Sequence, residues 1–165
     1  MRDLTVDLLK HLFKYDKETG ELRWDVKKAG VTYGAIAGCS NGRGYLVVRV
    51  NGNLYYVHRL IFLMHKGYLP KIIDHINGDK LDNRIENLRS ATVGQNQHNR
   101  KTNTNNTSGY KGVCWDKAMK KWRARIKLED KSIHLGYFTN AEEADKVVRA
   151  AREELHGSFA NHGDE

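Results

Sequence analysis

Cysteine and proline are scarce in this chain of 165 residues, which contains two cysteines and one proline. Cys39 and Cys114 lie far apart and form no CxxC pair, so the sequence excludes an ordinary cysteine-based zinc site and a disulfide framework. Long hydrophobic runs are also missing, and none approaches the ~18 residues that a membrane span needs. Asp3 and Asp7 interrupt the amphipathic start, which is therefore not typical of a signal or transit peptide. We expect a cytoplasmic protein in a reducing compartment, with one domain or two small ones and no membrane association.

Positive charge is in excess, and it is unevenly distributed. The chain has 28 lysine and arginine residues against 20 acidic ones, a formal net charge of +8 and a pI near 9.5. A merely basic protein would have the same totals. Between residues 100 and 127, however, nine residues are basic and only Asp116 is acidic, and the acids return in 142–154. This separation favours a basic surface backed by an acidic-faced helix, with nucleic acid as the partner.

The first half of the chain shows several clear helix and strand patterns. Leucines at helical spacing predict a helix over residues 4–14, followed by a hairpin that turns at Gly20. Two strands around the turn at Asn51-Gly52 lead into an apolar helix, which Pro70 should end. Residues 99–109 have no aliphatic side chain and consist mostly of Asn, Thr and Ser. They predict a linker or an extended strap that could lie along phosphates.

The pattern after residue 109 predicts three strands and one helix. Strands over 110–116, 121–130 and 131–139 precede a helix that begins after Asn140 and ends at Gly157. The middle strand alternates between an apolar side (Trp122, Ala124, Ile126 and Leu128) and a basic side (Arg123, Arg125 and Lys127). An apolar helix stripe should cover the apolar side of the sheet, and it consists of Ala141, Ala144, Val147, Val148, Ala151 and Leu155. The opposite side of the sheet is then uncovered and cationic.

The span of residues 72–99 is rich in Asp, Asn and His, which makes it either a solvated loop or a metal site. Its first two residues, Ile72 and Ile73, predict a short strand. Because neighbouring strand residues point to opposite sides, Asp74 and His75 should not both be in the core. Each of these features alone is weak evidence for catalysis, since an Asp-His pair and loop asparagines are more often structural.

A capping box of Thr92 and Gln95 predicts a helix that carries Asn96 in its first turn. A strand, a loop and a helix carrying Asp, His and Asn are enough to bind one divalent cation. Carboxylate and amide oxygens suit Mg²⁺ or Mn²⁺. An imidazole beside such a cation can deprotonate water near neutral pH.

The whole run VHRLIFLMHKGYLPKIIDHINGDKLDNRIENLRSATVGQNQHN, residues 57–99, resembles the HNH endonuclease family. The resemblance implies a ββα-metal fold that cuts phosphodiester bonds with one divalent ion, for which the oxygen ligands favour Mg²⁺ or Mn²⁺. Structural zinc is common in the family but is not expected here, because the chain lacks the cysteines that would bind it. By position, His75 is the general base, and Asp74 and Asn96 are the metal ligands. Asn87 is the central Asn that braces the loop and orients His75.

Two positions of this resemblance stay open. Asn96 stands where many members of the family carry His, and His98 is a rival metal ligand. His58 is either a structural partner or a residue near the scissile phosphate, and the structural interpretation is preferred.

Residues 108–161 resemble the AP2 DNA-binding domain through the strand and helix motifs Trp-x-Ala-x-Ile, Leu-Gly-x-Phe and Ala-Glu-Glu-Ala. The resemblance implies a three-stranded antiparallel sheet, packed on one helix, that lies in the major groove of DNA. By position, Lys111, Arg125, Lys127 and His134 fall where members of the family touch DNA, and Arg123 shares their face. Cys114 and Asp116 stand at positions that are usually basic in the family, so the target sequence of those members does not carry over to this chain.

These observations predict an α+β chain with an HNH nuclease domain over 1–99, a basic polar linker over 100–107 and an AP2-like domain over 108–165. A cutting domain joined to a DNA-reading domain is the architecture of a homing endonuclease, as encoded by phages and mobile elements. Arg100 and Lys101 of the linker join the predicted DNA contacts, Arg125 should read guanine, and Lys127 should contact phosphate. The expected partner is double-stranded DNA, bound by a monomer or a homodimer. The alternatives are a non-catalytic DNA-binding regulator with a decayed nuclease half, and an RNA-binding protein that uses the basic strap.

Overall fold

The computed structural model describes residues 4–163 apart from 28, 101, 103–104 and 130. It divides into two compact units, Met1–Ser90 and Ala91–Glu165, which we describe separately. No helix in the described part of the chain has the length and apolar character needed to cross a membrane. The mixed α+β class is confirmed in both units.

The described residues of the first unit form two helices, one 3-10 turn and three small sheets. Its sheets pair β1 with β2, β4 with both β3 and β5, and β6 with β7. Along the chain these elements are α1 (Val6–Leu12), β1 (Phe13–Tyr15), β2 (Leu22–Trp24), β3 (Cys39–Ser40), β4 (Leu46–Val50), β5 (Asn53–Tyr56), α2 (Val57–Lys66), β6 (Ile72–His75), η1 (Ile85–Asn87) and β7 (Leu88–Ala91).

Local sequence signals set most of these boundaries. Thr5 caps α1 by accepting a hydrogen bond from the amide of Leu8. Asn51 and Gly52 both have positive φ, as a tight two-residue hairpin turn requires, and they join β4 to β5. The predicted end of α2 was wrong: the helix stops at Lys66, and Gly67 adopts the left-handed conformation that closes it. Pro70 lies beyond this cap.

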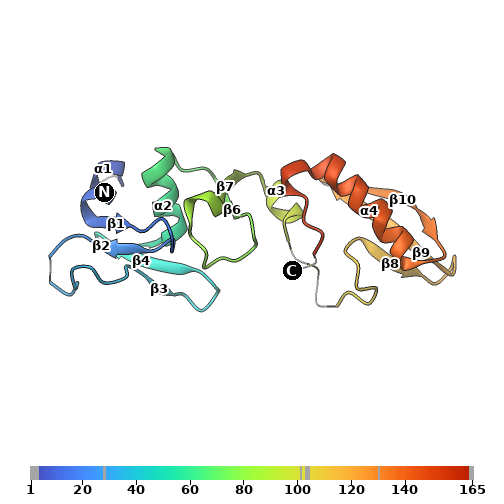
Figure 1. The fold of residues 1–165 in the computed structure, drawn as a ribbon, viewed down its shortest axis with the longest axis horizontal. Helices are drawn as coiled ribbons and strands as arrows, with labels where there is room; N and C mark the ends of the chain where they lie inside the picture. The colour runs from blue at the N-terminus through green and yellow to red at the C-terminus, as the bar shows by residue number, and fades with distance from the viewer. Residues whose placement is uncertain (1–3, 28, 101, 103–104, 130, 164–165) are drawn as a thin grey trace. The chain divides into compact units, whose positions relative to one another are not determined.

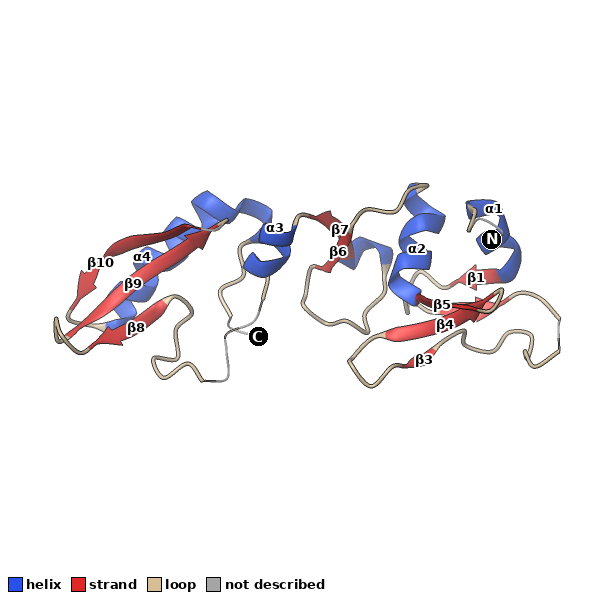
Figure 2. Ribbon diagram, turned by 180° about the vertical axis from the view of Figure 1, so that it is seen from behind, coloured by secondary structure: helices blue, strands red, loops and turns tan. Residues whose placement is uncertain are grey.

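The core of the first unit forms around α2, which packs against α1, β4 and β5 (Figure 2). Leu60, Ile61 and Phe62 are almost completely buried in it. The β1–β2 hairpin contacts the backbone that follows β6, where a Cβ on Gly20 would lie 2.7 Å from the carbonyl carbon of Asn83. Glycine is therefore required at this turn both for its positive φ and for this close approach.

The second unit is a three-stranded antiparallel sheet covered on one face by a long helix, as predicted. Helix α4 lies along the sheet in Figure 1, and the strand order is β10-β9-β8. Its elements are α3 (Val93–His98), β8 (Val113–Asp116), β9 (Lys121–Leu128), β10 (Lys131–Phe138), α4 (Ala141–His156) and η2 (Gly157–Phe159). The capping box of Thr92 and Gln95 is present at the start of α3, and Asn140 caps α4.

The buried stripe of α4 differs from the predicted one. Ala144 and Val148 are buried as expected, whereas Val147 is exposed. Asp145 and Arg152 are buried instead, because each is compensated: Arg149 bonds to the Asp145 carboxylate, and Arg152 donates to the carbonyl of Lys111. The sheet alternates as predicted, since Ala124 and Ile126 of β9 are buried under α4 and Arg125 and Lys127 are exposed on the other side.

The strap, which we define as residues 98–100, 102 and 105–107, belongs to the second unit. The ammonium group of Lys111 donates to three backbone carbonyls, those of His98, Arg100 and Asn161. The side chain of Asn161 donates to the carbonyl of Asn99. These bonds attach α3 and the start of the strap to the C-terminal segment. The structure therefore groups residues 91–99 with the second unit, whereas the sequence placed them in the first domain.

Candidate active site

Strand β6 carries Asp74 and His75, and both side chains are buried. Each residue is only 5% exposed, so the prediction that alternation would keep one of them out of the core was wrong. The two side chains occupy different polar environments, which compensate their burial separately. A buried carboxylate and a buried imidazole at adjacent positions form the centre of the candidate site.

Arg89 of β7 compensates the charge of Asp74. The Nε and a terminal nitrogen of Arg89 lie 2.8 and 2.7 Å from the Oδ2 atom of Asp74. A charge-assisted pair of this kind offsets the burial of a carboxylate. Asp74 is therefore held at a fixed place on the β6–β7 pair.

Asn83 holds the imidazole of His75. The Nε2 atom of His75 lies 3.3 Å from the Oδ1 atom of Asn83. An amide oxygen only accepts hydrogen bonds, so Nε2 carries the proton and Nδ1 keeps the basic lone pair. Burial lowers the pKa of His75, an effect that the Asn83 hydrogen bond and the nearby Asp74 oppose. The neutral imidazole is the form that can accept a proton.

Aromatic rings surround the imidazole of His75. The ring of His58, from α2, meets it edge to face with centroids 5.1 Å apart, and the ring of Tyr45 lies 6.2 Å away. The ammonium group of Lys80 lies over the ring of Tyr45, 4.8 Å from the ring centre. Burial, with His75 and Arg59 as further causes, lowers the pKa of His58 to about 3. His58 is therefore neutral and packs against His75, in agreement with the structural interpretation.

Asn87 braces the loop that follows β6. Its side-chain oxygen accepts from the amide of Asn77, and its side-chain nitrogen donates to Asn77 Oδ1 and to the carbonyl of Asp82. Tyr15, from the neighbouring hairpin, accepts from the amide of Ile85. The loop-bracing role expected of Asn87 is thus visible in its bonds. The hydrogen bond that fixes the His75 ring comes from Asn83.

Asn96 lies in α3 and therefore in the second unit, so its pairing with Asp74 stays a prediction. Its rival, His98, ends the same helix and stacks on the ring of His156, with centroids 3.6 Å apart and planes at 4°. This stacking gives the His98 ring a packing role inside the second unit.

Comparison with known proteins identifies the family. Residues 55–98 match the family model described as HNH endonuclease. Protein 3.8 of Escherichia phage T7 is 37% identical over 105 residues, which make up 62% of this chain and 86% of that protein. The chain belongs to the HNH endonuclease family. As an HNH endonuclease it is a hydrolase that cleaves DNA.

Two further relatives carry the family name, both uncharacterized HNH endonucleases of Acanthamoeba polyphaga mimivirus. One is 30% identical over 107 residues, covering 63% of this chain and 54% of the relative. The other is 42% identical over 69 residues, covering 36% of this chain and 17% of the relative. This chain thus spans only about half and about a sixth of their lengths. No solved structure matches it significantly.

The candidate donors of this HNH endonuclease suit a hard divalent cation. Within the described residues, no group of three or more His, Cys, Asp or Glu side chains is placed to bind a metal. The candidate donors are instead the carboxylate of Asp74 and, by the family pattern, the amide oxygen of Asn96. An all-oxygen set with few protein ligands fits Mg²⁺, which keeps several waters. Arg89 already binds the Asp74 carboxylate.

The predicted DNA-contacting residues divide into two groups. Arg123, Arg125, Lys127 and His134 lie on the sheet face away from α4, where β9 pairs with β10. Arg123 is 3.6 Å from the carboxylate of Asp116, which offsets its charge.

The remaining three predicted contacts lie on or beside the strap. Lys111 uses its three N–H donors on carbonyls, so we assign it a structural role in place of the predicted DNA contact. Arg100 is exposed on the strap, and Lys101 lies outside the described residues.

Sequence reasoning missed Asn83, Arg89 and Tyr45 as parts of the site. Asn83 is one of the loop asparagines that the sequence favours as structural. Its place between Asp82 and Arg84 in a strongly polar loop is only a weak signal of a role in the site. Arg89 sits on β7, the strand paired with β6, so a strand-pairing argument could have placed it opposite Asp74. Tyr45 precedes β4, and no local pattern connects it with residue 75.

Proposed function

We propose that this HNH endonuclease is a site-specific, divalent-metal-dependent enzyme of the homing type, with His75 as its general base. The observation that carries the proposal is the environment of His75: it is buried, its pKa is lowered, and its Nε2 atom is bonded to Asn83, beside the carboxylate of Asp74. This arrangement leaves the lone pair on Nδ1 of His75. A base in the neutral form at pH 7 is what hydrolysis of a phosphodiester requires.

In the proposed reaction, Nδ1 of His75 takes a proton from a water molecule. The water oxygen then bonds to phosphorus, the bond from phosphorus to the 3′ oxygen breaks, and the 3′ oxygen takes up a proton from solvent water. His58 and Asn83 keep the imidazole ring in place during this transfer, because they contact its edge and its Nε2 atom. Asn87 keeps the loop that carries Asn83 closed.

Asp74 and Asn96 would hold one Mg²⁺ or Mn²⁺ ion. When bound, the ion would supply electrostatic stabilisation of the charge on the scissile phosphate and the leaving 3′ oxygen. Asn96 rather than His98 is proposed as the helix ligand, because His98 is stacked on His156.

The second unit would bind double-stranded DNA and select the target. Its three-stranded sheet on one helix agrees with the AP2 resemblance, and Arg125 and Lys127 are exposed on the uncovered face. The homing type is supported by this pairing of a nuclease motif with a DNA-reading sheet and by relatives in a phage and a giant virus. A non-catalytic regulator is disfavoured, since Asp74, His75, Asn87 and Asn96 are all present.

Metal removal and restoration test the proposal. Purified protein should cut plasmid DNA with Mg²⁺ or Mn²⁺, lose cutting in EDTA and recover it when excess Mg²⁺ is added back. Asp74→Asn should be inactive under all these conditions, and Lys71→Gln, an exposed change in the same unit, should behave as wild type. Cutting that persists in EDTA would contradict the metal dependence.

A further inference from the structure

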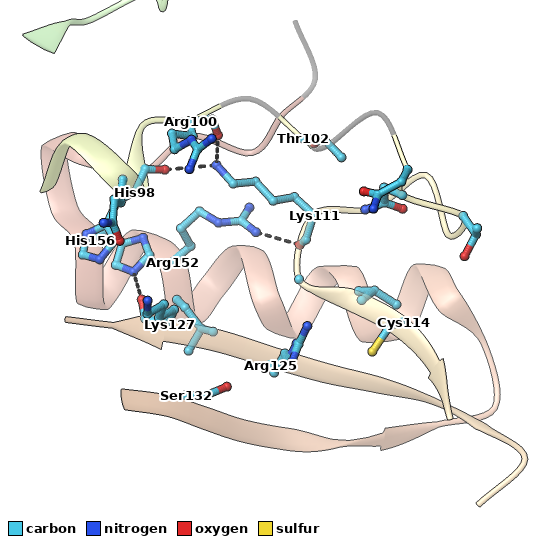
Figure 3. Close-up of a pocket in the computed structure, with 17 residues that line it drawn as sticks. His98, Arg100, Thr102, Lys111, Cys114, Arg125, Lys127, Ser132, Arg152 and His156 are labelled. Carbon is cyan, nitrogen blue, oxygen red and sulfur yellow. Dashed lines mark hydrogen bonds between the residues drawn. The ribbon is translucent and has the colours of Figure 1, made fainter. Parts of the chain in front are cut away.

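A cavity of about 600 Å³ lies in the second unit, between the strap and the sheet (Figure 3). We call it the strap cavity. Its walls are the strap, the start of β8, parts of β9 and β10, and the last turns of α4. The residues that carry the argument are Arg100, Lys111, Arg125, Lys127, Ser132 and Arg152.

The strap cavity is strongly cationic. Five of its lining residues are lysine or arginine, two more are histidine, and none of the described lining residues is acidic. Burial and the neighbouring Arg152 lower the pKa of Lys111 to about 8. The pKa of His156 is also lowered, by burial first and then by the repulsion of Arg152 and Lys111. Positive groups are therefore crowded here, and an anion would relieve their repulsion.

The cations of the strap cavity have two different roles. Lys111 and Arg152 are fixed by backbone carbonyls and shape the cavity wall. Within the described part of the chain, the side chains of Arg100, Arg125 and Lys127 make no hydrogen bond or ion pair. These three can therefore bind a ligand, and the hydroxyl of Ser132 adds a neutral donor at the same place. Arginine forks with a lysine and a hydroxyl are a donor set for phosphate oxygens.

We propose that the strap cavity binds a phosphate group of the DNA backbone. This inference rests on the proposed function of the second unit as a DNA-binding module, and it divides the sheet face in two. Arg125 and Lys127, inside the cavity, hold the backbone. Arg123 and His134 lie on the same strands and do not line the cavity.

Shape favours a phosphate over a base as the ligand. The edges of paired bases lie inside the grooves of a duplex and are read by side chains that reach outward. Backbone phosphates project from the duplex surface and can enter a recess. Arg125 lies inside such a recess, so it should act like Lys127, in contrast to the guanine contact that its residue type suggested.

The first test uses the full chain and inorganic phosphate. In ¹⁵N–¹H spectra, phosphate should shift the amides of Gly112 and Ser132, which line the cavity, and leave those of the first unit unchanged. A target duplex should then compete with phosphate for the same amides. Phosphate-induced shifts at other amides would overturn the proposal. Shifts at the cavity amides that the duplex does not displace would also overturn it, because they would assign the cavity to a free anion.

The second test measures DNA affinity against salt for Arg125→Gln and Lys127→Gln. Each should lower the slope of log affinity against log salt by about one unit and weaken all sequences of a randomised site alike. Lys146→Gln, which removes an exposed charge from α4 outside the cavity, is the matched control and should keep the wild-type slope. Unchanged slopes in the two cavity variants, or a loss of preference at a single base, would overturn it. Neither measurement depends on cleavage, so a failure of the nuclease proposal would be seen separately in the plasmid assay.

Discussion

At the residue scale, the protonation of His75 depends on Asn83. Burial lowers the pKa of His75, and the Asn83 hydrogen bond raises it again. The bond matters because Asn83 is itself buried, so water does not replace it. The neutral fraction of the proposed base therefore depends first on burial and then on one amide oxygen from the loop.

Asn83→Ala removes this bond and should lower the pKa of His75 further. The acid limb of the kcat/KM profile against pH, where protonation of His75 inactivates the base, should then move to lower pH. Asn83→Asp places a carboxylate at the same position and should move the limb to higher pH. Profiles that shift in the same direction, or that do not shift, would show that His75 is not the titrating base.

The residue pattern predicted Asp74, His75 and Asn87 as a group, because their spacing is a family motif. It did not predict how His75 is held, since Asn83 and Asn87 are both loop asparagines and only side-chain geometry separates their roles. The burial of both Asp74 and His75 was likewise not predicted. Strand alternation considers one strand alone, whereas Arg89 on the paired strand provides the partner that allows Asp74 to be buried.

At the element scale, α2 brings the buried His58 against β6. The pKa of His58 is lowered to about 3 in the folded protein, against about 6.5 when unfolded. Protonation of a histidine whose pKa is lower in the folded state than in the unfolded state does not stabilise the folded protein. The unfolded chain binds the proton first, so stability is full above pH 6.5 and falls as the pH drops from there toward pH 3.

The first unit should therefore lose about 2 kcal/mol of stability from His58 between pH 7 and pH 5. His58→Gln removes the titration and should make its urea midpoint less sensitive to pH over this range, as followed by the fluorescence of Trp24. His11→Gln, at an exposed position, is the control and should keep the wild-type pH dependence. Equal pH dependence in His58→Gln and wild type would contradict the burial of a neutral His58.

Elements with a strong local signal were predicted well. The capping box of α3, the Asn51-Gly52 hairpin and the limits of α4 all follow from caps and turn residues. The stripe of α4 was predicted less well, because Arg152 is buried by its bond to the carbonyl of Lys111. A hydrophobicity pattern does not show such a long-range bond. The end of α2 was misplaced because Gly67 stops the helix before Pro70 is reached.

At the scale of the whole molecule, two separate hydrophobic cores support two units. The core of the first unit draws only on residues up to Leu88, and that of the second on residues from Tyr110 onward. The sequence predicted the two halves, but it left α3 with the first. The bonds of Lys111 and Asn161 to the segment after α3 involve polar side chains far along the chain, which no local pattern reveals.

A fragment of residues 1–107 should keep a folded first unit and lose most DNA affinity. Its own core is intact, whereas the basic sheet is gone, and we expect binding at least about tenfold weaker. Circular dichroism with urea unfolding checks the fold, and gel shifts with the target duplex check affinity. Wild-type affinity in the fragment would show that the second unit is not the DNA-binding module, and a fragment without cooperative unfolding would show that the cores are interdependent.

The most direct test of the account is a paired measurement on His75→Ala, with cleavage and binding followed on the same DNA. His75 is proposed to do chemistry and contributes little contact area, so the single-turnover rate should fall ~10²–10⁴-fold while the affinity for DNA stays within about twofold. His11→Ala, an exposed histidine of the same unit, should match wild type in both assays. Wild-type turnover by a folded His75→Ala protein would contradict the assignment of His75 as the base.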